Sequence, residues 1–443
     1  MKQTKSYRVP DVSSGHCRAA ITAEVGALPG VESVNVHLDE RRVAVTGKDL
    51  DDGAVRAAIY DAGYRAIEDS ELPERSVDVV VIGAGQAGLA AGHFLSRQRR
   101  RFVILEAAEA VGSAWRGRWD SLTLFTPRRY SGLPGPAFPG DPDVYPTRDE
   151  VIAYLERYAA EFALPIEFNS PVRSLTRRDG SFNVELDDRR IVADHVVVAT
   201  GPFQQPRTPA LAGKLAADVV QLHSADYRRP SDVPAGRVLV VGGGNTGFQI
   251  AEELSTTHDV HLAIGSRQTP LPQKLLGRDL FWWLTRLGLL AKTVDSRFGR
   301  RARQRDTLIG SSPRRLRRRH GVELNPRAVD VSGRTVRFAD GDELEVDAVV
   351  WATGYRSDHS WIDLPVLEED GRPRHRRGVT EVPGLYFLGL SWQHTRGSAL
   401  IGWVGDDARF IAEKIESAAG TATTGNDYEG APTPQAVGAM EGV

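Results

Sequence analysis

The feature that most constrains the fold is the stretch from residue 77 to residue 95, where a valine-rich run leads into a glycine-rich turn. A continuous β-branched run is typical of a parallel strand that is covered on both faces. Gly83, Gly85 and Gly88 follow at G-x-G-x-x-G spacing. The first glycine lets the chain turn, the second leaves room for a pyrophosphate, and the third lets the next helix pack closely on the strand. The stretch therefore predicts a unit that binds a dinucleotide at a helix N-terminus.

An acidic residue stands where such a unit needs one. A second strand is expected over residues 101–105, and Glu106 follows it, 23 residues after Gly83 (106 − 83 = 23). A carboxylate about 20 residues beyond the first glycine can accept hydrogen bonds from ribose hydroxyls. The alternative interpretation is a glycine-rich turn in some other α/β fold.

The pattern repeats over residues 237–264, with Gly242, Gly244 and Gly247 at the same spacing. No carboxylate follows the second strand of this unit, and Arg267 stands 25 residues after Gly242 (267 − 242 = 25). An arginine can pair with the 2′-phosphate that a carboxylate would repel. The second site therefore predicts NADP(H), with a solvated surface arginine as the alternative for Arg267.

The order of these units predicts an α/β flavoprotein with two Rossmann-like dinucleotide-binding domains. The first is expected to hold FAD and the second NADPH, and the NADPH domain is inserted in the FAD domain. An Ala-Thr-Gly motif occurs at residues 199–201 and again at 352–354, where the chain is expected to cross between the domains. The predicted boundaries are 77–205 for the first part of the FAD domain, 206–345 for the NADPH domain, 346–418 for the second FAD part and 419–443 for a disordered tail.

A separate domain is expected over residues 1–69, joined by a linker at 70–76. Its segments follow the order βαββαβ of an α+β ferredoxin-like unit. With Leu-Pro-Gly-Val at residues 28–31, it resembles heavy-metal-associated domains, which bind soft ions through Cys-x-x-Cys. Ser14 stands where the first cysteine should be and Cys17 at the second. Since a serine oxygen is a poor ligand for a soft ion, a docking or dimerisation domain is favoured over metal binding at Cys17.

Composition excludes some classes of function. The formal net charge of −2 gives no global attraction for nucleic acid. No apolar run approaches the roughly 20 residues that span a bilayer, so no stable membrane insertion is expected. The first residues lack the apolar core of a signal peptide, which predicts a cytoplasmic protein. Residues 280–290 are apolar nearly all round and favour a core helix, with a substrate channel or membrane contact as alternatives; the arginine-rich residues 300–319 favour a solvated face.

Several motifs occur together and in order. They are the Gly-Ala-Gly-Gln-Ala-Gly turn at 83–88, Gly112-x-x-Trp115, the loop 126–130, both Ala-Thr-Gly motifs and residues 222–227. Over about residues 77–418 the chain resembles flavin-containing monooxygenases, especially the bacterial CzcO-type flavoproteins, which are similar to the plant YUCCA enzymes.

One signature of that family is incomplete. Its second half is present as His223 and Tyr227, whereas Ala217 and Val219 occupy its Phe and Gly positions. The residues after Tyr227 also depart from the Baeyer–Villiger pattern. The resemblance therefore implies oxygenation of a soft heteroatom or an oxidisable carbon rather than ester formation.

The resemblance implies that NADPH reduces FAD and that O₂ then forms a C4a-hydroperoxide, which gives one oxygen to a small organic substrate. The residues it suggests for catalysis are Trp115, Thr126 and His394. Together, the glycine motifs and the resemblance assign cofactor binding to Gly83, Gly85, Gln86, Ala87, Gly88, Glu106, Trp115, Arg118, Trp119, Thr200, Gly201, Gly242, Gly244, Asn245, Thr246, Gly247, Ser266, Arg267, Thr353, Gly354 and Gly389.

Two other functions are alternatives to a monooxygenase. A mercuric-reductase-like enzyme needs a redox pair of cysteines beside the flavin, and the chain has a single cysteine, so a thiolate relay is chemically excluded. A flavoprotein oxidase or regulatory partner of a metal-cation efflux system stays open. The identity of the substrate, a homodimer and a metal-handling partner of the N-terminal domain also stay open.

Overall fold

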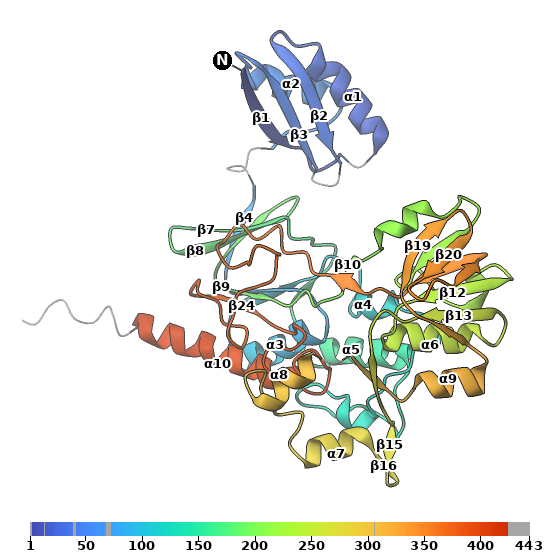
Figure 1. Ribbon diagram of the computed structural model, residues 1–443. Helices are drawn as coiled ribbons and strands as arrows, with labels where there is room; N and C mark the ends of the chain where they lie inside the picture. The colour runs from blue at the N-terminus through green and yellow to red at the C-terminus, as the bar shows by residue number, and fades with distance from the viewer. Residues whose placement is uncertain (1, 13, 39–40, 68–71, 305, 424–443) are drawn as a thin grey trace, which may run out of the picture.

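The computed structural model describes residues 2–12, 14–38, 41–67, 72–304 and 306–423, which form an N-terminal domain and two domains centred on sheets (Figure 1). The larger sheet has the order β6-β5-β4-β9-β8-β7, with β24 paired to β9. Val79, Val80 and Val81 of β4 are fully buried, and β5 and β9 run parallel on either side. The strands are β4 (Glu74–Ile82), β5 (Phe102–Leu105), β6 (Ile166–Glu167), β7 (Ser174–Arg178), β8 (Ser181–Glu185), β9 (Arg190–Val198) and β24 (Leu385–Phe387).

Three helices cover one face of this sheet: α3 (Gln86–Arg97), α5 (Arg148–Glu161) and α10 (Val404–Thr423). On the other face, apolar residues of β4, β5 and β9 share a second core with residues of β7 and β8 and with the segment around Ile362. Helix α10 continues to Thr423, whereas the chain was predicted to be disordered from residue 419. The Gly/Thr-rich composition of residues 419–423 favoured disorder. Helix α10 nevertheless continues through them, because extending an existing helix costs far less free energy than starting a new one. The rest of the predicted tail, residues 424–443, lies outside the described residues.

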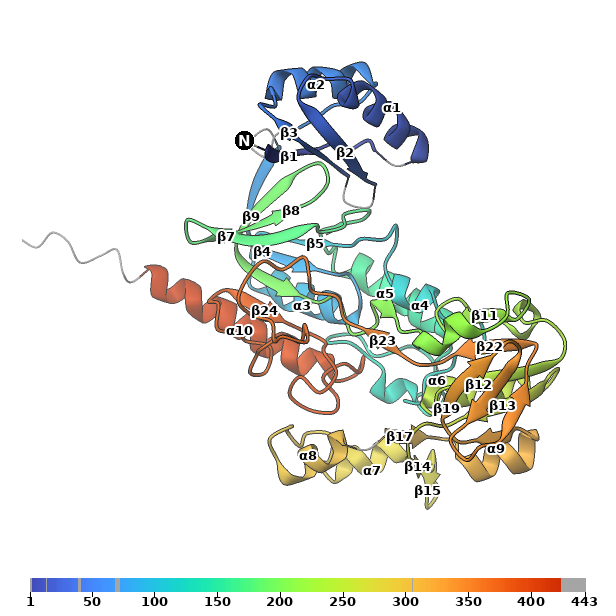
Figure 2. The same ribbon diagram turned by 45° about the horizontal axis from the view of Figure 1, so that its top comes forward.

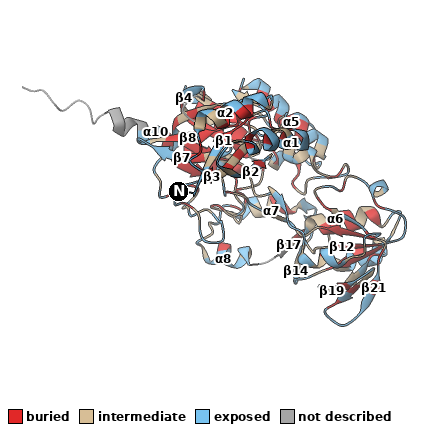
Figure 3. Ribbon diagram, turned by 90° about the horizontal axis from the view of Figure 1, so that it is seen from above, coloured by how far each residue is buried: buried red, intermediate tan, exposed pale blue. Residues whose placement is uncertain are grey.

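The second sheet is parallel throughout, in the order β11-β22-β12-β13-β18. Helices α6 and α9 pack on one face, and a three-stranded meander, β19-β20-β21, covers the other. Figure 3 shows the buried residues along β12 and the side of α6 turned towards it. The elements are β11 (Val220–His223), β12 (Arg237–Val241), α6 (Asn245–Leu254), β13 (Asp259–Ala263), α9 (Pro313–His320), β18 (Glu323–Asn325), β19 (Ala328–Ser332), β20 (Thr335–Phe338), β21 (Glu343–Glu345) and β22 (Ala348–Trp351).

The two chain crossings lie side by side, as the insertion of one domain in the other requires. Strand β10 (Gln205–Pro206) pairs antiparallel with β23 (Tyr355–Arg356). Strand β22 precedes this crossing and pairs with β11 and β12, so the predicted boundary at residue 346 falls inside the second sheet. The predicted boundary is wrong because a short, fully apolar strand such as β22 can pair in either sheet, and its sequence does not indicate in which one.

The N-terminal domain has three antiparallel strands in the order β1-β3-β2, with two helices. They are β1 (Lys2–Arg8), α1 (Gly15–Gly26), β2 (Val31–His37), β3 (Arg42–Lys48) and α2 (Asp52–Asp61). The last expected strand is reduced to one bridge between Ile67 and Arg8. The domain also contacts the FAD-side sheet, because the buried Arg8 pairs with the buried Glu185 at 2.9 Å and donates to the carbonyl oxygen of Leu186. Part of the predicted linker, residues 70–71, lies outside the described residues, and β4 already begins at Glu74.

A long insertion of the second domain reaches back to the first (Figure 2). Leu280 and Phe281 are buried against Phe125, Tyr130 and Trp403. The prediction of a core helix over 280–290 therefore holds only for its first part, because the helix ends at Arg286 and Leu287, which follows it, is 60% exposed. No described helix is both long and apolar enough to cross a membrane. The insertion contains β14 (Gln268–Leu271), β15 (Lys274–Leu275), β16 (Arg278–Asp279), α7 (Leu280–Arg286), α8 (Arg297–Arg303) and β17 (Asp306–Ile309). The remaining short helices are α4 (Ser113–Arg116), η2 (Arg128–Tyr130), η3 (Ala210–Lys214) and η4 (Pro230–Asp232).

Candidate functional site

The first glycine turn is built as a phosphate cradle. Gly83 has φ +109°, and a Cβ there would lie 2.7 Å from the carbonyl oxygen of Ala199. A Cβ on Gly88 would overlap the carbonyl oxygen of Gly83, so α3 can pack on the turn only without a side chain. Gly85 is the N-cap of α3, and a Cβ on it would meet no protein atom within 4 Å. The free N–H groups of α3 therefore face space in which a pyrophosphate can bind.

Glu106 is held in place beside this space. Its carboxylate accepts hydrogen bonds from the backbone N–H groups of Ala84, at 2.8 Å, and Ala108, at 3.1 Å. Each carboxylate oxygen has a further lone pair for a ribose hydroxyl. Glu106 lines a cavity of about 390 Å³ with Gly83, Gly85 and Gln86, and with Ala87, Thr200, Gly201 and Gly389. The structure thus brings together most of the residues predicted to bind FAD, and their arrangement fits that group.

A hydrogen-bonded chain continues from the cradle towards the second domain. The indole N–H of Trp115 donates to Oε1 of Gln86 at 3.4 Å, and Nε2 of Gln86 donates to the carbonyl oxygen of Ala399 at 3.4 Å. Trp115 packs against the apolar cores of both domains. Arg118 donates to the hydroxyl of Tyr355, and its guanidinium carbon lies 4.9 Å from the ring centre of Phe203. These contacts place Trp115 and Arg118 at the seam between the domains.

The second glycine turn repeats the construction. Gly242 has φ +136°, and a Cβ on Gly247 would overlap its carbonyl oxygen. Gly244 is the N-cap of α6, and a Cβ on it would also meet open space. Asn245 is fixed by β17, since its Oδ1 accepts from the N–H of Ile309 at 2.9 Å. Gly242, Gly244 and Asn245 line a second cavity of about 1080 Å³, which Ser266, Thr353 and Gly354 also line.

The arginines of this cavity are not the predicted one. Arg267 is exposed and is not among the lining residues, and Thr246 is absent from them as well. Arg327 lines the cavity instead and donates to the carbonyl oxygen of Gly265, two residues after β13, at 3.0 Å. Motif spacing does not indicate Arg327, because this residue lies 85 residues beyond the glycine turn (327 − 242 = 85) and only the fold brings it there.

Arg396 is a second arginine that lines this cavity. Burial lowers the pKa of its guanidinium. The side chain has no hydrogen-bond or ion-pair partner in the part of the chain that the structure describes. A half-buried guanidinium without a counter-charge is suited to bind an anionic group of a ligand.

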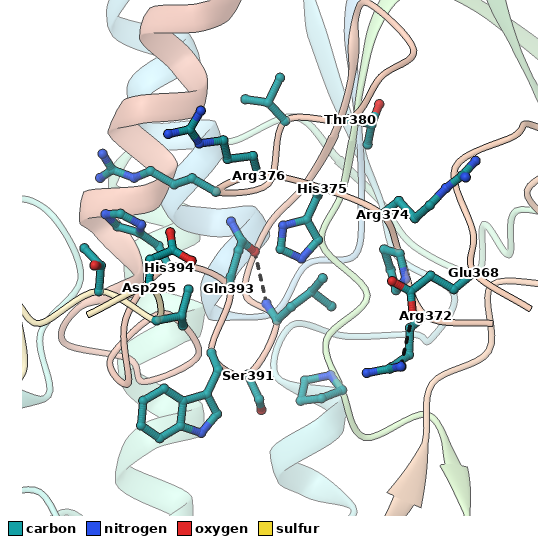
Figure 4. A pocket seen from close by; sticks show the side chains of 18 of the residues that line it. Asp295, Glu368, Arg372, Arg374, His375, Arg376, Thr380, Ser391, Gln393 and His394 are labelled. Carbon is teal, nitrogen blue, oxygen red and sulfur yellow. Dashed lines mark hydrogen bonds and ion pairs between the residues drawn. The ribbon is translucent and has the colours of Figure 1, made fainter. Parts of the chain in front are cut away.

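Three predicted residues lie elsewhere. The hydroxyl of Thr126 is buried and hydrogen bonded to that of Ser131 at 2.9 Å, and Thr126 lines neither of the two cofactor cavities. Trp119 is buried in the core of the second domain. His394 lines a third cavity, of about 1350 Å³, and not the first two; there, burial lowers its pKa, and the charge of Arg377 lowers it further (Figure 4).

The two retained residues of the monooxygenase signature, His223 and Tyr227, form hydrogen bonds near the boundary between the two domains. Nδ1 of His223 accepts from the N–H of Ala225 at 3.0 Å, so its Nε2 carries the proton and donates to the carbonyl oxygen of Gly354 at 3.1 Å. The hydroxyl of Tyr227 donates to Glu253 on α6 at 2.7 Å. His223 therefore positions the crossing segment at Gly354, Tyr227 is tied to α6, and neither residue lines a cofactor cavity.

Two dinucleotide-binding folds, one inserted in the other, define the class of the chain as a two-dinucleotide oxidoreductase. The family model for pyridine nucleotide-disulphide oxidoreductases matches residues 80–274, and the model for the heavy-metal-associated domain matches residues 6–65. The CzcO-like oxidoreductase of Geobacillus kaustophilus is 47% identical over 341 residues, which are 76% of this chain and 98% of that protein. The chain therefore belongs to the CzcO-like family of oxidoreductases.

Two further relatives extend this assignment. The probable indole-3-pyruvate monooxygenase YUCCA7 of Arabidopsis thaliana is 31% identical over 388 residues, 76% of this chain and 86% of that protein. The flavin-containing monooxygenase from Stenotrophomonas maltophilia superposes with a TM-score of 0.67 at 32% identity and covers 78% of this chain and 99% of its own. The predicted resemblance, fold class, enzyme class and flavin dependence are confirmed.

Proposed function

We propose that the protein is an FAD-dependent monooxygenase that consumes NADPH and O₂ to oxygenate a small organic substrate. The observation that carries this proposal is that the two dinucleotide cavities adjoin: Phe203 lines both of them. The only cysteine of the chain, Cys17, lies in the N-terminal domain. Electrons would therefore pass directly from nicotinamide to flavin, without a disulfide between them.

The charge of the second cavity supports NADPH over NADH. Arg207, Arg303, Arg327 and Arg396 line it, and no aspartate or glutamate does so among its described lining residues. An acidic residue would select the free ribose of NADH, whereas guanidinium groups attract the additional phosphate of NADPH.

The roles of the other residues follow from their contacts. The N–H groups of α3 and α6 would bind the two pyrophosphates, and Glu106 the ribose of FAD. Gln86 and Trp115 would orient the flavin. The aromatic side chains at the boundary between the domains, Phe203 and Tyr355, would exclude water from it. When bound, the flavin would supply the redox chemistry, taking electrons from NADPH and activating O₂ for transfer of one oxygen atom to the substrate.

An aromatic 2-oxo acid is the first substrate class to test. The YUCCA relatives are named for indole-3-pyruvate. Trp392 and Arg396 line the cavity between the domains, so an aromatic surface and an unpaired guanidinium are both present there. The test compares NADPH consumption and peroxide release with indole-3-pyruvate and with its methyl ester, which lacks the negative charge. Faster NADPH consumption with less peroxide for the acid alone supports this class, and equal effects of both contradict it.

One observation favours a second candidate, a flavoprotein oxidase or regulator in metal-cation handling. The heavy-metal-associated domain contacts the FAD-side sheet through the buried pair of Arg8 and Glu185, so the two parts have a fixed interface. Stopped-flow absorbance after mixing NADPH-reduced protein with O₂ separates the candidates. A transient near-ultraviolet band before oxidised flavin returns supports a monooxygenase, whereas direct return of oxidised flavin supports the oxidase or regulator.

A further inference from the structure

The insertion of the second domain exposes an unusual number of large apolar side chains. Of the ten such side chains that are exposed in the described chain, four lie between residues 275 and 298. Leu276 is 83% exposed, Leu287 60%, Leu275 47% and Phe298 46%. Exposed apolar residues that occur singly need no explanation, but a cluster of them marks an interaction surface.

The most exposed of these, Leu276, occupies a strained position. It joins β15 to β16 together with Gly277, and both residues have positive φ, +48° for Leu276 and +73° for Gly277. Such two-residue turns favour Asn-Gly, because a bulky side chain is disfavoured at positive φ. A leucine there is unfavourable for the turn itself and places an apolar side chain at the tip of the hairpin.

The hairpin and α7 form one surface. The indole N–H of Trp283 donates to the carbonyl oxygen of Leu275 at 2.9 Å, and the guanidinium carbon of Arg278 lies 5.4 Å from the ring centre of Trp282. Figures 1 and 2 show the hairpin and α7 at the end of the molecule opposite the N-terminal domain, with α8 next to α7. We call residues 274–303 the basic apolar face.

The charge of this face differs sharply from that of the whole chain. It carries eight basic and two acidic residues, a formal charge of +6 (8 − 2 = 6), in a chain of formal charge −2. All eight basic side chains are exposed, and none forms an ion pair with a carboxylate within the described residues. The basic residues are Lys274, Arg278, Arg286, Lys292, Arg297, Arg300, Arg301 and Arg303.

We propose that the basic apolar face binds the surface of an anionic lipid bilayer. Aliphatic and tryptophan side chains flanked by lysine and arginine are the composition of segments that lie in the membrane interface. A second copy of the chain fits poorly, because a symmetric contact would bring two faces of charge +6 together. Nucleic acid fits poorly as well, since Leu276 and Leu287 can neither stack on bases nor hydrogen bond to them.

Flotation of the full-length protein with vesicles tests this proposal. Vesicles of phosphatidylcholine alone are compared with vesicles that also contain phosphatidylglycerol, at low and high salt. The protein should bind the anionic vesicles, and high salt should weaken the binding. Leu276→Asp should lower the affinity at least tenfold, and Arg278→Gln with Arg286→Gln by about thirtyfold.

Tyr60→Asp is the matched control, since Tyr60 is 73% exposed on the N-terminal domain and should not affect vesicle binding. Flavin content and melting temperature show that each variant is folded. Absence of vesicle binding, equal binding to both kinds of vesicle, or binding that Leu276→Asp leaves unchanged overturns the proposal. Size-exclusion chromatography that shows a dimer lost in Leu276→Asp, without vesicle binding, would assign the face to a second copy.

Discussion

Replacing Arg327 by alanine should selectively weaken the use of NADPH. Arg327 lines the second cavity and is oriented by the carbonyl oxygen of Gly265, 3.0 Å from its Nη2. A hydrogen bond to a charged group contributes about 1.5–3 kcal/mol. Because Arg327 is exposed, solvent screening places the loss near the lower limit, which is roughly tenfold in affinity.

The assay is the rate of flavin reduction under anaerobic conditions as a function of NADPH or NADH concentration. Arg327→Ala should raise the half-saturating NADPH concentration about tenfold and leave that of NADH nearly unchanged. Arg267→Ala is the matched control, because Arg267 is exposed outside the cavity lining and should have little effect. Equal losses for both nucleotides in Arg327→Ala, or the NADPH-specific loss in Arg267→Ala instead, would refute the reasoning.

Three other predictions concern the site and its supports. Arg396→Gln should raise KM for an anionic substrate roughly tenfold and leave FAD content unchanged, measured by steady-state NADPH consumption. Gly85→Ala should keep the melting temperature but lose FAD affinity in a flavin titration, whereas Gly88→Ala should lower the melting temperature as well, because its Cβ meets the backbone. Removing one partner of the buried Arg8–Glu185 pair should destabilise the domain contact by about 3 kcal/mol, followed by hydrogen exchange of β1 and β8. Burial by itself would raise the pKa of Glu185, but Arg8, Ser174 and Arg190 outweigh it and hold the pKa below its usual range. The stabilisation from this carboxylate is therefore present above about pH 4.3 and should be lost as the pH falls further.

The sequence predicts those parts of the site that local geometry determines. Both glycine turns, the strands before them and Glu106 lie where the spacing indicated, because backbone sterics and short-range packing set them. The side chains that complete the second cavity could not be predicted in this way. Arg327 and Arg396 are distant in sequence from the turn at Gly242, and only the packing of the domains brings them to one cavity.

The sequence also could not predict which residues of the insertion are buried. Residues 280–290 are apolar nearly all round, which favoured a core helix, but the rest of the chain provides one apolar surface for it, at Phe125 and Trp403. Leu287, which follows the helix, stays exposed. The roles of Thr126 and His394 and the cytoplasmic location stay predictions, and metal binding at Cys17 and a homodimer stay open alternatives.

The central claim is that electrons pass from the nicotinamide to the flavin without a sulfur relay. The most direct measurement is anaerobic flavin bleaching by NADPH in the FAD-loaded wild-type protein and in Cys17→Ser. The account predicts that NADPH bleaches the flavin at the same rate in both proteins. Flavin that NADPH does not reduce, or a reduction that is lost in Cys17→Ser, would contradict it.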